Sequence, residues 1–115
     1  MLWWGAVKRV ERALLGQLDA GEHLEASALG RVPLKGDFAI GRTGARLIWV
    51  GVTKFTGKPN GKVFLDDIQC VRLGRGNIFY TPIRRCDGSV FNLKVERAWA
   101  ERMWEVFADI APSES

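Results

Sequence analysis

The hydrophobic residues of the N-terminal segment, residues 1–18, recur at the spacing of an α-helix. On a helical wheel they form a face about 120° wide, and cations occupy the opposite side. Trp4 and Leu15 fall outside this stripe, and Gly21 supplies a stop signal after it. The pattern predicts an amphipathic helix over residues 1–20 that packs on the rest of the chain. The stripe consists of Trp3, Ala6, Val7, Val10, Leu14 and Leu18.

From Glu22 onward the hydrophobic positions alternate, which is the period of β-strands. Turn signals separate the runs, and Asp87-Gly88 is the strongest of them. Residues 53–62, TKFTGKPNGK, predict a solvated loop or an open hairpin tip. Pro82 cannot donate a ladder hydrogen bond, so its strand is predicted to lie at a sheet edge or to carry a bulge. Strands are expected at residues 23–32, 37–43, 45–53, 62–68, 70–75, 77–85 and 89–95.

The last element returns to helical spacing over residues 95–111. Glu101 and Glu105 carry like charges four residues apart, so this helix is expected to depend on its packing face more than on ion pairs. Pro112 ends it, and residues 112–115 are predicted to form a disordered tail. A single domain over residues 21–111 is therefore expected behind the N-terminal helix. The apolar stripe of the last helix consists of Val95, Trp99, Met103, Val106 and Ile110.

This order of elements, antiparallel strands followed by one helix, resembles the pleckstrin-homology superfold, specifically bacterial PH-like and GRAM-like domains. LDAGEHLEASALG, residues 18–30, is similar to the family's entry from a leading helix into the first strand. GRTGARLIWV, residues 41–50, is similar to the third strand, and KVFLDDIQCV, residues 62–71, to the fourth, with Phe64 in place of the usual proline. The resemblance implies an α+β fold, a PH-like barrel of about seven antiparallel strands capped by a C-terminal helix, with an additional N-terminal amphipathic helix.

The same resemblance implies a non-catalytic binding module, because PH-like domains hold phosphoinositides, peptides, partner domains or copies of themselves. Lipid-binding members typically carry lysines and an arginine pair, K-x(n)-R-x-R, on the first hairpin. Arg31, Lys35 and Arg42 are present in the corresponding segment, but the R-x-R pair is missing and Asp37 adds a negative charge. These departures disfavour tight inositol-phosphate recognition.

Composition narrows the class without naming a ligand. The chain has 115 residues, 47% of them hydrophobic, which is enough for one domain with a single core. Its formal net charge of +4 permits contact with anionic surfaces, but the charge is less concentrated than in nucleic-acid binders. The longest uncharged stretch, residues 76–83, is too short to span a bilayer, and the early cations do not fit a secretory signal. A cytoplasmic protein with reduced thiols at Cys70 and Cys86 is the resulting expectation.

Candidate chemistry is sparse, so the chain is expected not to be an enzyme and to use no cofactor or metal. His23 is the only histidine, and no motif places a nucleophile beside it. Asp66 and Asp67 are neighbours in a predicted strand, so their carboxylates point to opposite faces. GKPNGK lacks the spacing and the hydroxyl of a phosphate-binding loop. Cys70 is predicted to be buried and Cys86 to be exposed beside the Asp87-Gly88 turn.

Two binding surfaces are predicted. The first is a protein or self-association surface, which uses apolar side chains left over from the helical stripes: Trp3, Trp4, Leu15 and Trp104. The alternative is weak peripheral binding to anionic lipid headgroups by basic loops, if those loops lie at the same end of the barrel. The cations of that surface are Arg31, Lys35, Lys54, Lys58 and Lys62. Neither a nucleic acid nor a particular small-molecule substrate is indicated.

Overall fold

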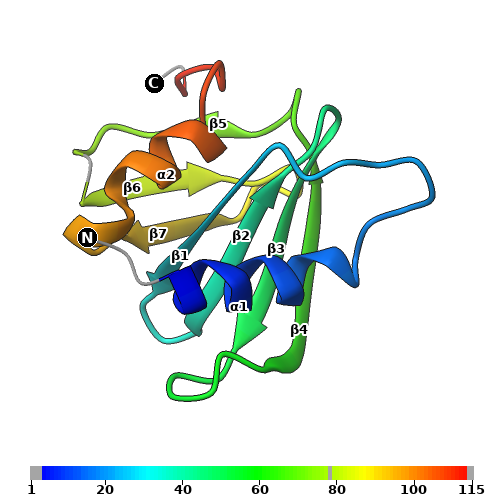
Figure 1. Cartoon of the computed structure of the whole chain (residues 1–115). Helices are drawn as coiled ribbons and strands as arrows, with labels where there is room; N and C mark the ends of the chain where they lie inside the picture. The colour runs from blue at the N-terminus through cyan, green and yellow to red at the C-terminus, as the bar shows by residue number, and fades with distance from the viewer. Residues whose placement is uncertain (1–3, 78, 114–115) are drawn as a thin grey trace.

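The computed structural model describes residues 4–77 and 79–113 and consists of one antiparallel sheet with helices at both chain ends (Figure 1). Both helices predicted from the hydrophobic pattern are present, and seven strands lie between them. The elements in chain order are α1 (Trp4–Leu15), β1 (Ala26–Val32), β2 (Gly36–Arg42), β3 (Arg46–Val52), β4 (Pro59–Asp67), β5 (Arg72–Leu73), β6 (Tyr80–Arg84), β7 (Val90–Lys94), the 3-10 turn η1 (Arg97–Trp99) and α2 (Ala100–Val106). The α+β class predicted from the sequence is therefore confirmed.

The sheet has the strand order β4-β3-β2-β1-β7-β6-β5 and bends sharply where β1 meets β7. Within the described chain, β1 and β7 are joined by a single residue pair, Arg31 with Lys94. Although four positions apart in the sheet, β4 and β7 bring the rings of Phe64 and Phe91 to a centroid distance of 5.2 Å. The two halves of the sheet thus face each other across one aromatic core, which also contains Phe38, Trp49 and Phe107.

Helix α1 covers the outer face of the β1–β3 half and buries Val7, Val10, Ala13 and Leu14 (Figure 1). The packing is close because β2 has no side chain at Gly41, where a Cβ would come within 2.9 Å of Leu14. Helix α1 ends at Leu15, earlier than the predicted residue 20. The backbone turns at that point, and residues 16–21 belong to the connection that follows the helix. Gly21, predicted as the stop, has φ +80° and belongs to this connection.

The C-terminal helix is shorter than predicted. Residues 95–111 contain only η1 and α2, because Val95 still continues from β7 and Asp109 adopts a left-handed φ of 63°. The predicted apolar stripe is nevertheless buried as a set. Helix α2 packs against β1, and Arg102 donates to the Ser27 carbonyl at 3.0 Å. The first residues predicted as a tail are held in place, since the Ser113 amide donates to the Leu73 carbonyl.

Two strand predictions are wrong. The predicted loop at residues 53–62 is shorter, because β4 begins at Pro59, which an edge strand tolerates at its first position. The strand of Pro82 was expected at an edge or with a bulge, yet β6 lies between β7 and β5. Its proline is accommodated because β5 pairs only with Ile83 and Arg84 and ends before reaching it.

Candidate functional site: the basic end

The β1–β2 turn, residues 33–35, and the β3–β4 loop, residues 53–58, lie at the same end of the sheet (Figure 1). We call this region the basic end. A hydrogen bond joins its segments, since Lys62 of β4 donates to the Lys35 carbonyl at 2.9 Å. The loop also packs on α1, because a Cβ at Gly57 would lie 3.4 Å from the Arg9 side chain. The condition for the lipid-binding alternative, that both basic loops share one end, is therefore met.

Each loop carries one fully exposed hydrophobic residue at its tip. The relative exposures are 107% for Leu34 and 88% for Phe55. Leu34 also has a left-handed φ of 71°, a conformation that costs a leucine about 1 kcal/mol and that glycine or asparagine adopts more readily. The turn therefore keeps a large apolar side chain in water and in a strained conformation, which packing of the core does not explain.

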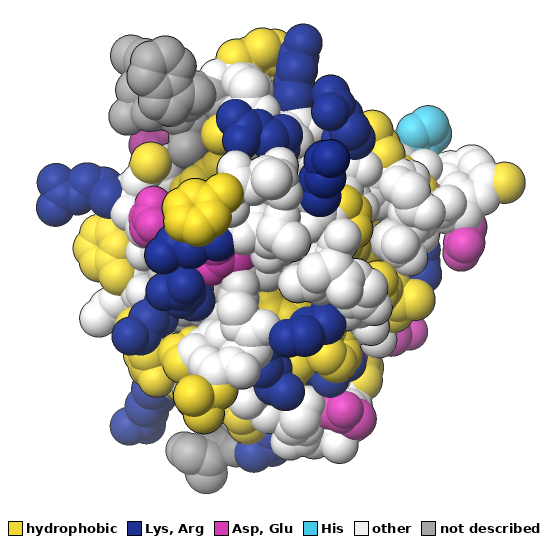
Figure 2. Space-filling view, turned by 90° about the horizontal axis from the view of Figure 1, so that it is seen from below, with side chains coloured by type: hydrophobic (Ala, Val, Ile, Leu, Met, Phe, Trp, Pro, Cys, Tyr) yellow, Lys and Arg dark blue, Asp and Glu magenta, His cyan; other side chains and the backbone are white. Residues whose placement is uncertain are grey.

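Cations surround these tips without carboxylate partners. Among the described residues, no ion pair involves Lys35, Lys54, Lys58 or Lys62. Arg31 differs, because its Nε lies 3.2 Å from Asp37 of β2. Figure 2 views the molecule from this end: Lys and Arg side chains gather on the face, hydrophobic side chains lie between them, and Asp and Glu side chains are sparse. The arrangement offers apolar contact and positive charge together.

The residues predicted for protein contact are exposed but spread over different elements. Trp4 at the start of α1 is 67% exposed, and Leu15 at its end is 55% exposed. Trp104 on α2 is 52% exposed and lines a small hollow with Leu73 and Thr81, whereas Leu15 lines a groove with Arg102. The structure thus brings the predicted lipid-binding cations together but divides the predicted protein-contact residues among separate surfaces. Trp3 lies outside the described residues.

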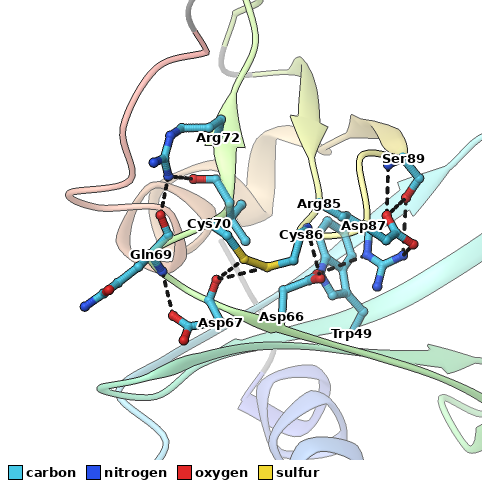
Figure 3. The surroundings of a disulfide bond; sticks show 11 residues. Trp49, Asp66, Asp67, Gln69, Cys70, Arg72, Arg85, Cys86, Asp87 and Ser89 are labelled. Carbon is cyan, nitrogen blue, oxygen red and sulfur yellow. Dashed lines mark hydrogen bonds and ion pairs between the residues drawn. A yellow bond between two sulfur atoms is a disulfide. The ribbon is translucent and has the colours of Figure 1, made fainter.

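The opposite end of the molecule, which we call the disulfide end, contains the β2–β3 turn, the β4–β5 connection and the β6–β7 turn (Figure 1). Cys70 and Cys86 form a disulfide there, with their Cα atoms 5.1 Å apart. The disulfide, drawn in Figure 3, contradicts the expectation of two reduced thiols. The predicted burial of Cys70 is also wrong, because both cysteines are exposed. Sequence spacing could not reveal this bond, since it depends on how the two halves of the sheet meet.

A buried ion pair lies next to the disulfide. Asp66 accepts hydrogen bonds from Arg85 Nε at 3.0 Å and from Trp49 Nε1 at 3.2 Å (Figure 3). The Arg85 guanidinium lies against the rings of Phe64 and Phe91, at 4.8 and 4.9 Å from their centroids. As predicted, Asp66 and the adjacent aspartate point to opposite faces, Asp66 being only 3% exposed. The pair is structural, since Asp66 and Arg85 are buried and hydrogen-bonded to protein groups.

A second ion pair fixes the segment between α1 and β1. Glu22 receives hydrogen bonds from Arg46 at the start of β3, including one of 2.9 Å from Nε. The Arg46 bonds, with help from the Asp19 amide, lower the pKa of Glu22 to about 2. The neighbouring His23 is exposed, and the described residues contain no cluster of three or more metal-ligating side chains.

Searches of protein-family models, curated proteins and solved structures find no match for this chain. None of its described helices combines the length and apolar character needed to cross a bilayer.

Proposed function

We propose that this chain is a PH-like binding module that attaches peripherally to anionic lipid surfaces through its basic end. The seven-stranded antiparallel sheet closed by a C-terminal helix supports the PH-like part of the proposal. A single observation carries the lipid part: two neighbouring loop tips expose Leu34 and Phe55 amid lysines that have no carboxylate partner among the described residues. Neither tip contains an acidic residue.

The energetics suit reversible attachment. Each cation near an anionic membrane contributes about 1 kcal/mol, and transfer of a leucine or phenylalanine side chain out of water contributes roughly 1.5–3 kcal/mol. The two contributions respond differently to salt, because screening weakens the attraction of the lysines and leaves apolar insertion intact. Binding should therefore decline as salt rises, without vanishing.

Vesicle flotation with phosphatidylcholine, with or without phosphatidylglycerol, tests the proposal. The wild-type chain should float only with the anionic vesicles. Lys58→Glu should weaken binding roughly 10- to 30-fold, since it removes one attraction and adds one repulsion of about 1 kcal/mol each. Arg84→Glu is the matched control, because it changes the net charge equally at an exposed position of β6 near the disulfide end. Equal losses in both variants, or no flotation of the wild type, would refute the proposal.

The disulfide bears on where such a surface would be. Disulfides persist in oxidising compartments and are rare in the cytoplasm. The bond between Cys70 and Cys86 therefore favours a membrane surface that faces an oxidising compartment over the expected cytoplasmic one. Labelling of the native protein with a thiol reagent, before and after reduction, tests this. If the cysteines react without prior reduction, the disulfide is absent and a reducing compartment is favoured instead.

A protein contact is the second candidate, and the half-exposed Trp104 on α2 favours it. Light scattering coupled to size exclusion should then reveal an oligomer that Trp104→Ala converts to a monomer. A monomeric wild-type chain at high concentration would remove self-association and leave only contact with a different protein.

A further inference from the structure

A cavity of about 610 Å³ opens beside the basic end, where β1 and β7 stop pairing. Beyond the Arg31–Lys94 pair the two strands diverge, and Leu29 and Gly30 face Val95 and Glu96 across the gap. The cavity is thus built by the fold itself, at the bend of the sheet. Its volume lies in the range of small-molecule sites.

The walls of this cavity are aromatic. Trp99 of η1 lines it while being only 5% exposed, so its position is fixed by the core. Phe79 and Tyr80 line it as well and remain 44% and 41% exposed, although nearby core positions of the same sheet are closed to water. Half-exposed rings around a hollow offer faces for stacking to a planar ligand.

The charges of the lining are unequal. Arg31, Lys54 and Lys94 contribute three cations, against the two carboxylates of Asp37 and Glu96. Asp37 engages Arg31, whereas Lys54 and Lys94 have no carboxylate partner among the described residues. Lys94 Nζ lies 5.9 Å from the centroid of the Tyr80 ring, which places a cation beside an aromatic wall. One negative charge on a ligand would balance the site, and several would meet Asp37 and Glu96.

We infer that this cavity is a binding site for a small amphipathic monoanion with a planar aromatic body, such as an aryl carboxylate or sulfonate. The aromatic body stacks against Phe79, Tyr80 and Trp99, and the anionic group lies toward Lys94 and Lys54. This inference shares Arg31 and Lys54 with the proposed lipid surface but does not rest on lipid attachment, because the ligand binds in water and needs no vesicle. Multiply charged phosphates are disfavoured by the two carboxylates in the lining.

Fluorescence titration with 8-anilinonaphthalene-1-sulfonate, an aromatic monoanion, tests the site without vesicles. The folded protein should bind it saturably with one site per chain, and more tightly than the uncharged N-phenyl-1-naphthylamine. Lys94→Gln should weaken sulfonate binding about 5- to 10-fold, the size expected for one partly screened charge pair. It should leave binding of the uncharged probe unchanged.

Arg84→Gln is the matched control, since it neutralises an exposed cation of β6 that does not line the cavity. Phe79→Ala is the second variant and should weaken both probes, because it removes a wall and no charge. Equal effects of Arg84→Gln and Lys94→Gln would overturn the inference, as would the absence of saturable binding. Probe fluorescence that rises only as near-ultraviolet circular dichroism is lost would overturn it too, because the probe would then report unfolded chain. If the wild-type chain binds the probe but does not float with anionic vesicles, the lipid proposal is refuted and the cavity inference stands.

Discussion

The two ends of the bent sheet differ in whether their charged side chains are paired within the protein. At the disulfide end, Asp66, Arg85 and Glu22 are all paired within the protein, and a covalent bond joins the two halves of the sheet. At the basic end, lysines face solvent without carboxylate partners among the described residues, and Leu34 and Phe55 extend into water. The difference separates groups that hold the fold from groups that the fold presents. Substitutions at the first end should change stability and leave binding intact, and substitutions at the second should do the reverse.

The largest effect is expected from Asp66→Ala. The substitution removes the buried partner of the Arg85 guanidinium and leaves it only the exposed carboxylate of Asp87, which costs about 3–5 kcal/mol in the free energy of unfolding. Urea denaturation measures it. Asp67→Ala is the control, since its exposed neighbouring carboxylate should cost less than about 1 kcal/mol. If Asp66→Ala lowered the free energy of unfolding as little as the control does, the conclusion that the disulfide end stabilises the fold would be wrong.

Loss of the disulfide comes next. The double substitution Cys70→Ser with Cys86→Ser should lower the free energy of unfolding by about 3 kcal/mol, the value for closing a loop of this size, in which the cysteines are 16 residues apart. Denaturation with and without reductant should differ for the wild type and coincide for the variant. Vesicle flotation and probe binding should be unchanged in folded variant protein. If the folded cysteine variant lost vesicle or probe binding, binding at the basic end would depend on the disulfide end, and the separation of the two roles would be wrong.

Leu34→Asn sharpens the contrast, because the two readouts should move in opposite directions. Asparagine adopts the left-handed conformation more readily than leucine, so the free energy of unfolding should stay equal or rise by up to about 1 kcal/mol. Flotation with anionic vesicles should weaken about 10-fold or more, since the tip loses a side chain whose burial contributes roughly 1.5–3 kcal/mol. If the variant binds vesicles as the wild type does, the exposed leucine has no part in attachment.

The smallest effect is a change in pH dependence at Glu22. Its pKa in the folded chain is about 2, against an ordinary value of 4.5, so the folded state binds fewer protons than the unfolded state between these values. This stabilising contribution is fully present above the ordinary pKa and is lost as the pH falls toward 2. Glu22→Gln should therefore flatten the dependence of stability on pH in that window. Glu25→Gln, which removes a more exposed carboxylate, is the control substitution.

Local patterns predicted the elements well where one face is buried. The buried face of α1 at Val7, Val10 and Leu14, a strand within residues 45–53 and the Asp87-Gly88 turn follow from residue type and spacing, and all are present. The predicted ends of helices and strands were wrong where tertiary contacts determine them. Pro59 enters β4 because it pairs with Val52 of β3, and α2 begins late because the Val95 amide donates to the Phe79 carbonyl.

The site was less predictable than the fold. The basic cations were visible in the sequence, but their proximity depended on the sheet order. Residue spacing does not predict the ion pair of Asp66 with Arg85 or the disulfide of Cys70 with Cys86, because both contacts join the two halves of the sheet. The exposure of Leu34 gave no sequence signal either, since a leucine beside a proline in a turn is ambiguous until its backbone is known.

Strand β1 has a consequence for how the chain acquires its structure during synthesis. Its neighbours include α1 from the start of the chain, β7 near the end, and α2, whose Arg102 reaches back to Ser27 across 75 residues. A nascent chain can form the β1–β4 meander early, but the open edge of β1 lacks its partners until β7 and α2 have emerged. Until then β1 presents an unpaired edge, which can bind chaperones or pair with other chains and aggregate.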